Sequence, residues 1–215
     1  MGELILIRHG ETEWSRSGRH TSHTDLPLTA VGERQARALV PLIADRKIGL
    51  TLASPALRAR HTAELAGLAS PRITPDLREW DYGGYEGVTT AEIHRTRPSW
   101  NLWTDGVAPG SAAHPGETPA QVGERADRVL TEIRAAAEQL GDADIALVAH
   151  SHFLRVFTAR YLGLTPSGGT LFRLATGAVS RLGTEHGNPV ITAWNLVLPE
   201  TLFHAAAPEP AQSPE

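Results

Sequence analysis

Two arginines and two histidines stand where the fold of the chain could gather them into one site. Arg8, His9, Arg58 and His150 each follow, directly or within a few residues, a short apolar run that ends abruptly. In open α/β sheets the ligand site lies at the carboxyl ends of the strands, so residues that follow buried strands can converge there. All four side chains are cations or hydrogen-bond donors. Together they would accept a tetrahedral dianion, and the chemistry we expect is attack on a phosphate ester.

His9 has the surroundings of a nucleophile. The positive charges of Arg8 and Arg58 should disfavour the protonated imidazole, which leaves the ring neutral and nucleophilic at working pH. The two guanidinium groups can bind the equatorial phosphate oxygens bidentately. Gly10 would let the backbone approach the phosphate without a side chain in the way. We therefore expect a phosphohistidine on His9, formed without a metal.

A departing alkoxide needs a proton, so the site should also contain an acid. The segment LREWDYGGYEG offers Glu79 and Asp81 close to two aromatic residues and a glycine pair. Either carboxyl group could act first as an acid and then as a base toward water. Spacing alone leaves the choice between them open.

The residues that would position these groups follow an α/β pattern. Residues 3–7, 49–53 and 144–149 are apolar runs of the kind found in strands buried on both faces of a parallel sheet. We predict a single-domain three-layer sandwich, in which a mostly parallel twisted sheet is flanked by helices. AVSRLGTEH and PVITAWN, around a turn at Gly187 and Asn188, predict an antiparallel hairpin at the edge of the sheet near the C-terminus.

Residues 118–141 give the clearest helical pattern, with one apolar stripe. Thr118 can cap this helix in a capping box with Gln121. Further helices are expected after Thr29, where Pro41 limits or kinks the helix, and over residues 153–162.

Residues 83–117 do not fit the repeat of strands and helices. They hold Trp100, Trp103, three prolines and several glycines, and only residues 90–95 show a short helical pattern. We interpret this segment as an insertion over the edge of the sheet, and more specifically as a lid over the site. Several of the tryptophans could belong to the core or line the mouth of the pocket. The domain would then span residues 1–206, followed by a disordered tail over residues 207–215.

The composition is that of an ordinary globular protein, with 41% hydrophobic residues, 20% charged residues and a formal net charge of −4. It does not suggest a nucleic-acid or membrane partner. The chain has no cysteine, which excludes disulfides and thiolate chemistry. His150 and His152 form an HxH pair without an accompanying Asp or Glu, so we expect no metal and no cofactor. The apolar run before Arg8 is too short for a signal peptide, and a cytoplasmic location is expected.

The string LIRHGETEW resembles the signature of the histidine phosphatase superfamily, which includes cofactor-dependent phosphoglycerate mutases, fructose-2,6-bisphosphatases and broad sugar phosphatases. TDLPLTAVGERQA, SPALRARHTAELA, LREWDYGGYEG, PGET and AHSHFLR follow in the order expected for this family. These matches cover the chain from about Leu4 to Arg155.

The resemblance implies a role for each matching residue. It makes His9 the phosphorylated nucleophile and His150 the second histidine that contacts the transferring phosphoryl group, with Arg8 and Arg58 as phosphate ligands. It also aligns the acid with Glu79 in preference to Asp81. The residues expected to bind substrate are Gly10, Ser15, Thr21 and Ser151, although many family members place Asn where Ser15 stands. Arg19, His20 and His23 follow in a loop that could bind a distal anionic group or could simply be solvated.

Within the family, EWSRSG, LREWDYGGYEG and the spacing of the tryptophans are most similar to fungal sedoheptulose-1,7-bisphosphatase and related sugar phosphatases. The expected substrate is a small phosphorylated metabolite. The mutases follow their acid with a YGxLxGLNK pattern, whereas this chain has YGGYEGVTT. The missing lysine counts against a mutase. It also leaves fewer cations for a second phosphate, so a monophosphate is at least as well supported as a bisphosphate.

Three other functions remain open at this point: a cofactor-dependent phosphoglycerate mutase, a protein phosphatase acting on phosphohistidine or phosphotyrosine, and a non-catalytic module that binds phosphorylated ligands. The oligomeric state is also open, and a homodimer is one alternative.

Overall fold

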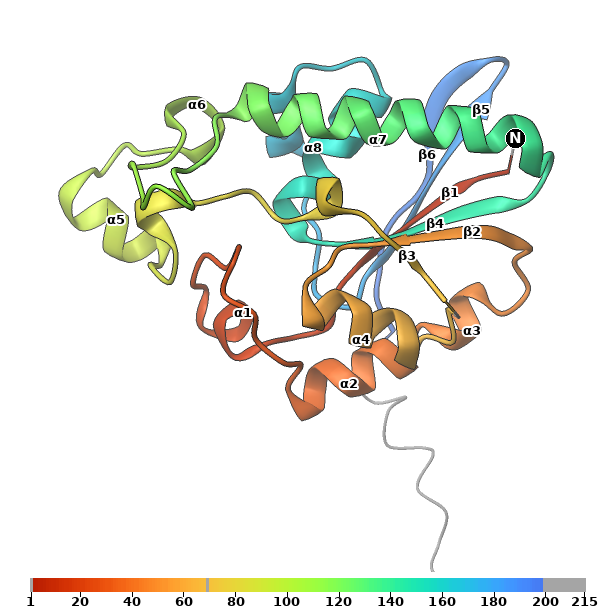
Figure 1. The fold of residues 1–215 in the computed structure, drawn as a ribbon, viewed down its shortest axis with the longest axis horizontal. Coiled ribbons are helices and arrows are strands. Elements are labelled where there is room, and N and C mark those ends of the chain that lie inside the picture. Colours follow the sequence, from red (N-terminus) through yellow and green to blue (C-terminus); the bar gives the residue numbers. More distant parts are fainter. Residues whose placement is uncertain (1, 69, 199–215) are drawn as a thin grey trace, which may run out of the picture.

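A six-stranded sheet forms the centre of the molecule in the computed structural model, which describes residues 2–68 and 70–198. The strands lie in the order β3-β2-β4-β1-β5-β6 (Figure 1). They are β1 (Leu4–Arg8), β2 (Ile48–Ala53), β3 (Arg72–Ile73), β4 (Asp144–Ala149), β5 (Val179–Glu185) and β6 (Asn188–Leu196). Strands β1 to β4 run parallel to one another, whereas β5 pairs antiparallel with both β1 and β6. The predicted, mostly parallel sheet with an edge hairpin is confirmed.

Helices cover both faces of this sheet (Figure 1). On one face lie α7 (Pro119–Leu140) and α8 (Ser151–Tyr161), and on the other lie α2 (Ala30–Arg37), α3 (Val40–Ile43) and α4 (Leu57–Leu65). Side chains alternate along a strand, so β1 contributes Leu4 and Leu6 to the core under α7 and α8, and Ile5 and Ile7 to the opposite core. These two cores make the three-layer sandwich that the apolar runs predict.

The main helix of the molecule starts and stops where the sequence indicates. Thr118 and Gln121 form the capping box of α7, and the helix ends at Gly141, which has a φ of 65°. The helix after Thr29 is interrupted before Pro41, and Pro41 falls within the short α3. In contrast, α8 begins at Ser151, two residues earlier than expected.

The edge hairpin turns one residue earlier than the sequence suggests. Glu185 pairs with Asn188, so the two residues of the turn are His186 and Gly187, and Asn188 already belongs to β6. Both turn residues have positive φ angles, 50° and 82°, which is the conformation of a type I′ turn.

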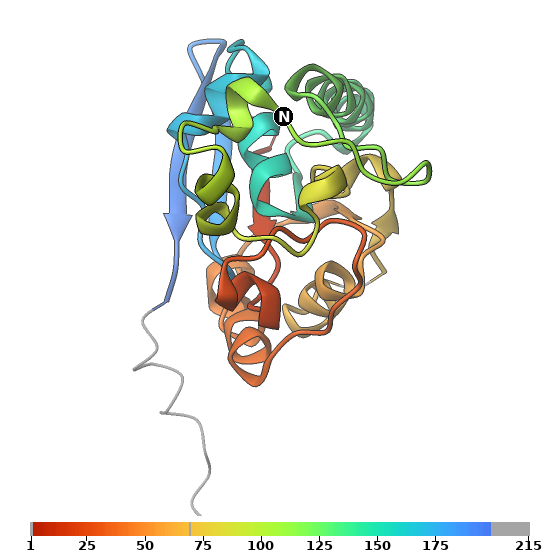
Figure 2. The ribbon, with the colours of Figure 1, turned by 90° about the vertical axis from the view of Figure 1, so that its left-hand side faces the viewer.

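Residues 83–117 lie beyond the carboxyl ends of the strands and face the viewer in Figure 2. They contain the short helices α5 (Thr90–Thr96) and α6 (Leu102–Asp105). Trp100 and Trp103, which could have lined a pocket mouth, are only 6% and 7% exposed and pack with Trp80 into the core under α7 and α8. The segment is therefore fixed to the core by its two buried tryptophans. Its motion as a lid stays a prediction.

The remaining elements are short. They are α1 (Glu13–Ser17) and three short 3₁₀-helices, η1 (Pro75–Leu77), η2 (Gly83–Tyr85) and η3 (Pro166–Leu171). None of the helices within the described residues has the length and apolar character needed to cross a membrane. The tail predicted over residues 207–215 lies outside the described residues.

Candidate active site

The two histidines meet because β1 and β4 are neighbouring parallel strands. Arg8 is paired with Ala149 at the ends of these strands, so His9 and His150 leave the sheet side by side. The N–H of His9 donates to the carbonyl oxygen of Ala149 at 3.0 Å, and the two imidazole centroids are 5.1 Å apart. Both rings are buried, with 5% and 1% of each residue exposed.

The surroundings of His9 fix which nitrogen can attack. Its Nδ1 lies 2.7 Å from the carbonyl oxygen of Gly10, an acceptor, so Nδ1 must carry the proton and Nε2 keeps its lone pair. Burial, followed by the charges of Arg58 and Arg8, lowers the pKa of His9 well below its ordinary value of 6.5. The ring is therefore a neutral imidazole with a free Nε2, as a nucleophile requires.

Three polar atoms around His9 are buried without a hydrogen-bond partner among the described residues. They are Nε of Arg8, Nε of Arg58 and Nδ1 of His150. Within the described part of the chain only one other buried side-chain N or O atom is left unpaired, on Arg181. Buried polar groups are almost always paired, because an unpaired one costs about 1–3 kcal/mol. Their gathering at this one place indicates a site that is completed by an anionic ligand.

Arg58 is fully buried, and most of its donors are already used. Its guanidinium group donates to the carbonyl oxygens of Thr21, Ser22 and Thr24 at 3.0–3.3 Å. These hydrogen bonds hold the loop that follows α1. The Nε atom of Arg58 is buried without a partner among the described residues and can donate to a ligand. Arg8 is only partly buried, and its guanidinium group makes one hydrogen bond among the described residues, from a terminal nitrogen to the carbonyl oxygen of Leu174 at 2.6 Å. Arg8 therefore has more donors left for a ligand than Arg58.

Glu79 is held in place by backbone amides from two segments. Its carboxylate accepts hydrogen bonds from the N–H groups of Trp80, His152 and Phe153 at 2.8–3.0 Å. The last two belong to the first turn of α8, whose N–H groups have no partner within the helix. Glu79 thus caps α8, and this explains why the helix begins at Ser151.

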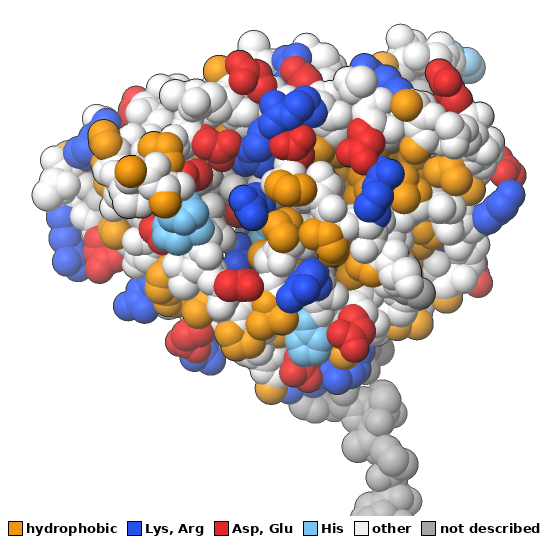
Figure 3. All heavy atoms as spheres, viewed as in Figure 1, with side chains coloured by type: hydrophobic (Ala, Val, Ile, Leu, Met, Phe, Trp, Pro, Cys, Tyr) orange, Lys and Arg blue, Asp and Glu red, His pale blue; other side chains and the backbone are white. Residues whose placement is uncertain are grey.

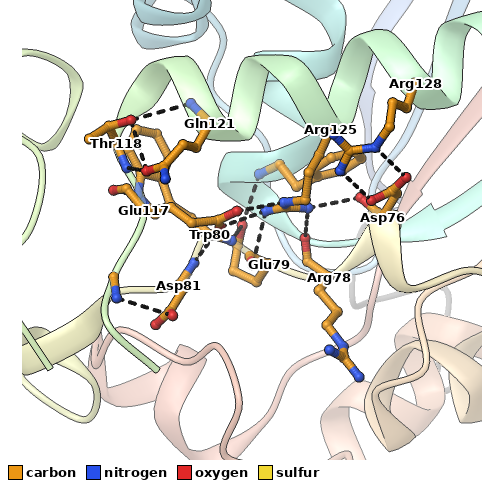
Figure 4. A network of polar contacts seen from close by, with 12 residues as sticks. Asp76, Arg78, Glu79, Trp80, Asp81, Glu117, Thr118, Gln121, Arg125 and Arg128 are labelled. Carbon is orange, nitrogen blue, oxygen red and sulfur yellow. Dashed lines mark hydrogen bonds and ion pairs between the residues drawn. The ribbon is translucent and has the colours of Figure 1, made fainter. Parts of the chain in front are cut away.

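Arg125 of α7 fixes the segment that carries Glu79 (Figure 4). Its guanidinium group pairs with the carboxylate of Glu117 and donates to the carbonyl oxygens of Asp76, Arg78 and Glu79. Nothing in the sequence indicates this role, because Arg125 is one of several arginines on the polar side of the helix.

Asp81 lies in a different setting from Glu79. One carboxylate oxygen accepts the N–H of Gly83 at 3.0 Å, and the other accepts the N–H of Gly116 at 3.1 Å. Asp81 therefore ties the two ends of the 83–117 segment together (Figure 4). It lines only the larger of the two cavities described below, whereas Glu79 lines both.

The residues expected to bind substrate are placed in different ways. Ser15, Thr21 and Ser151 all line the cavity beside His9. The Ser15 hydroxyl is also engaged in the capping box of α1 with Thr12. Gly10 does not line the cavity. A Cβ at this position would lie 2.3 Å from the carbonyl oxygen of Gly32, so close packing against α2 gives a separate reason for a glycine.

Three residues near the nucleophile were not singled out as site residues. Ser54 comes directly after β2, and its hydroxyl lies 2.8 Å from Nε2 of His150. The hydroxyl of Tyr82 lies 2.6 Å from Nδ1 of His152, and both side chains line the cavity beside His9. Burial raises the pKa of Tyr82 and lowers that of His152, so the pair is a neutral hydrogen bond. For Ser54 a signal existed, since it follows an apolar run as His9 does.

Two cavities meet at Glu79. One, of about 310 Å³, contains His9, Arg8 and Ser15 in its lining. The other, of about 570 Å³, contains His150 and Ser54. Each is within the range of small-molecule sites.

One group of potential metal ligands occurs among the described residues, but not at His150 and His152. Ligand atoms of His23, Asp81 and His114 lie within 4.8 Å of one another. The two imidazole rings are stacked at 3.8 Å and are nearly parallel, at 7°. Lone pairs lie in the plane of each ring, so two parallel rings cannot both point at one ion. This arrangement is a stacking contact between the loop after α1 and the 83–117 segment.

Comparison with protein families gives one match that spans nearly the whole chain. Residues 4–197 match the model described as histidine phosphatase superfamily (branch 1).

Named relatives agree with this match. An acid phosphatase of Mycobacterium tuberculosis is 39% identical over 186 residues, which cover 86% of this chain and 87% of the relative. Sedoheptulose 1,7-bisphosphatase of Saccharomyces cerevisiae is 38% identical over 188 residues, 74% of this chain and 67% of the relative.

Solved structures share the fold. An open reading frame product of Mycobacterium tuberculosis superimposes with a TM-score of 0.82 at 37% identity, over 91% of this chain and 98% of that one. A mycobacterial glucosyl-3-phosphoglycerate phosphatase, solved with VO3, gives a TM-score of 0.78 at 26% identity, over 91% and 99% of the two chains.

Proposed function

Since the chain belongs to the histidine phosphatase superfamily and is a phosphatase, we propose that it hydrolyses small phosphomonoesters of the sugar phosphate class through a phosphohistidine on His9. The observation that carries this proposal is the set of three unpaired buried nitrogens, on Arg8, Arg58 and His150, around a neutral imidazole. Developing charge on the equatorial oxygens of a phosphoryl group needs preorganised donors of this kind.

The reaction consists of two displacements at phosphorus. In the first, the lone pair of Nε2 of His9 forms the N–P bond while the P–O bond to the leaving group breaks. Glu79 gives its proton to the departing oxygen. In the second, Glu79 takes a proton from water as that water attacks phosphorus and the N–P bond breaks. Phosphate leaves, and Glu79 and His9 return to their starting protonation states.

The names of two relatives favour a sugar phosphate. They are the yeast sedoheptulose 1,7-bisphosphatase and the glucosyl-3-phosphoglycerate phosphatase of Mycolicibacterium vanbaalenii, which is 31% identical over 169 residues. A mutase would return the phosphoryl group to bound product. It would therefore require added 2,3-bisphosphoglycerate for activity, whereas a phosphatase would not.

The test is phosphate release from a panel of sugar phosphates and p-nitrophenyl phosphate in the presence of EDTA. We expect turnover by the wild type and a loss of at least about 10³-fold in His9→Asn. His186→Asn, in the exposed turn between β5 and β6, is the matched control and should retain full activity.

The covalent step has its own readout. Rapid quenching followed by mass spectrometry under neutral conditions should find one phosphoryl group on the peptide that contains His9. Activity that survives in His9→Asn, or a phosphoryl group on another residue, would refute the mechanism.

A further inference from the structure

The two cavities that meet at Glu79 have opposite charge. The cavity beside His9 is lined by four arginines and one carboxylate, which are Arg8, Arg19, Arg155, Arg173 and Glu79. The larger cavity is lined by two arginines and five carboxylates, which are Arg78, Arg125, Asp25, Asp76, Glu79, Asp81 and Glu117. On the face shown in Figure 3 acidic and basic side chains are interspersed.

Two of these arginines have no protein partner for their charge. The guanidinium groups of Arg19 and Arg173 take part in no hydrogen bond or ion pair among the described residues, and both residues are exposed. Glu92 is close enough for the charge of Arg19 to affect it, but its carboxylate is used by the N-cap of α5 at Thr89.

The backbones that carry these two arginines are nevertheless well fixed. The N–H of Arg19 donates to the carbonyl oxygen of Trp14, and Arg19 forms a β-bridge with Thr89. The carbonyl oxygen of Arg173 accepts the indole N–H of Trp194 at 2.6 Å. Only the side chains need to be ordered by a ligand, which keeps the entropic cost of binding low.

Arg155 adds a third positive charge at the wall of the same cavity. Its guanidinium group lies 4.5 Å from the ring centroid of Trp103 and donates to the carbonyl oxygens of Gly169 and Thr170. No carboxylate of residues 2–68 and 70–198 is hydrogen-bonded to it. Arg155 is therefore a fixed charge, whereas Arg19 and Arg173 also have free donors.

Charge decides which cavity receives the part of the substrate beyond the reacting phosphate. Glu79, which protonates the leaving oxygen, borders both cavities, so geometry alone permits either. One phosphoryl dianion cannot neutralise four guanidinium groups. In the larger cavity, five carboxylates would repel any further anion.

On the basis of the proposed function, we infer that the cavity beside His9 contains a subsite for a second anionic group, with Arg19 and Arg173 as its ligands. The substrate class is then a small phosphomonoester that bears a second phosphate. This goes beyond the sequence-based expectation, in which the missing lysine left fewer cations for a second phosphate and a monophosphate was at least as well supported as a bisphosphate. The cations come instead from the loop after α1 and from the segment before β5, two places that no single motif connects.

The experiment compares kcat/KM for fructose 1,6-bisphosphate, fructose 6-phosphate and p-nitrophenyl phosphate. We expect the wild type to prefer the bisphosphate by about 10-fold or more, as one charge-assisted anion contact predicts. The double variant Arg19→Gln/Arg173→Gln should lose most of this preference, mainly through an increase in KM.

Two single variants are matched controls for the loss of positive charge. Arg78→Gln removes an exposed guanidinium from the larger cavity, and Arg16→Gln removes one that is paired with Glu13 on α1. Neither should change the preference for the bisphosphate. An equal loss in Arg78→Gln would overturn the assignment to the cavity beside His9, and so would an unchanged preference in the double variant.

Calorimetry separates this inference from the proposed function. Binding of fructose 1,6-bisphosphate and fructose 6-phosphate to His9→Asn requires no turnover, and the bisphosphate should bind at least about 10-fold more tightly. One outcome is that no substrate is hydrolysed, yet the bisphosphate binds more tightly than the monophosphate and the difference depends on Arg19 and Arg173. The subsite is then supported and the phosphatase mechanism is refuted. If p-nitrophenyl phosphate is hydrolysed but the difference is absent, the subsite alone fails.

Discussion

His9 differs from the histidine of a nucleophile–histidine–carboxylate triad in the group that its Nδ1 faces. That group is the neutral carbonyl oxygen of Gly10, whose hydrogen bond favours an imidazolium less than burial, Arg58 and Arg8 together oppose it. A carboxylate at this place would favour the proton that a nucleophilic imidazole must not carry. The two arginines that we propose as phosphate ligands therefore act together with burial to keep the imidazole of His9 unprotonated.

This arrangement predicts an unusual titration of His9. Because burial, Arg58 and Arg8 all lower its pKa, the ring should stay neutral well below pH 6.5 in the free enzyme. Arg8→Gln removes one of the positive charges and should raise the pKa of His9 toward its ordinary value. NMR of ¹⁵N-labelled imidazole across pH 4–8 measures both proteins directly. A wild-type midpoint at or above 6.5 would contradict the electrostatic argument.

The choice between Glu79 and Asp81 can be tested by matched amide substitutions. We expect Glu79→Gln to lower kcat for a sugar phosphate by about 10²–10⁴-fold, the usual contribution of a general acid. The loss should be smaller for p-nitrophenyl phosphate, whose leaving group needs little help from a proton. Asp81→Asn removes a charge from the turn at Gly83 and Gly116 and should cost less than about tenfold on either substrate. A reversed order of the two variants would make Asp81 the acid.

At the level of elements, the site depends on contacts between segments that are far apart in the chain. Glu79 lies between the first turn of α8, which it caps, and Arg125 of α7, which holds its backbone. Neither helix carries a group that reacts. Their contribution is to fix the position of one carboxylate beside His9.

Removal of this connection should reduce both stability and activity. Arg125→Met leaves the carboxylate of Glu117 and three carbonyl oxygens without their donor, and it should lower the free energy of unfolding by about 2 kcal/mol or more. It should also lower kcat, because the carbonyl group of Glu79 is released. Urea denaturation and steady-state kinetics on the same preparations test the two effects.

Arg128→Met is the control for this prediction. It lies on the same helix and binds the same segment, but its ion pair with Asp76 is largely exposed and should contribute less than about 1 kcal/mol. If Arg125→Met and Arg128→Met were equally mild, the buried network would have no role in placing Glu79.

The sequence predicts those elements whose signals are local. The capping box at Thr118 and the three apolar runs lie within a few residues of the structures they specify, and each was found. The start of α8 was missed because its cap is Glu79, more than seventy residues away in the chain. The roles of Arg125 and Arg173 and the burial of Trp103 could not be predicted for the same reason, since only the folded chain brings these residues to the site. Motif order predicts His9 as the nucleophile, but the charge of the cavity beside His9 could be described only from the structure.

On the scale of the whole molecule, the buried neutral histidines of the site should make the free energy of unfolding depend on pH. His9, His150 and His152 all have pKa values well below 6.5, mainly because of burial and then because of neighbouring positive charges. In the unfolded chain these three rings would titrate near 6.5. The unfolded state therefore binds more protons than the native state once the pH falls below that value.

The sign of the effect follows directly from this difference. The free energy of unfolding should be constant above about pH 7 and should fall as the pH drops below 6.5, by up to about 1.4 kcal/mol per pH unit for each histidine that stays neutral in the native state. Urea denaturation between pH 5 and 8 measures this slope. Burial also lowers the pKa of His20, so it contributes to the same slope. His9→Asn removes one of these groups and should reduce the slope by up to about 1.4 kcal/mol per pH unit, whereas the exposed His186→Asn should not change it. A slope that is the same in all three proteins would mean that His9 titrates in the native state as it does in the unfolded chain, which would contradict a buried neutral nucleophile. A slope of zero would extend that conclusion to the other buried rings.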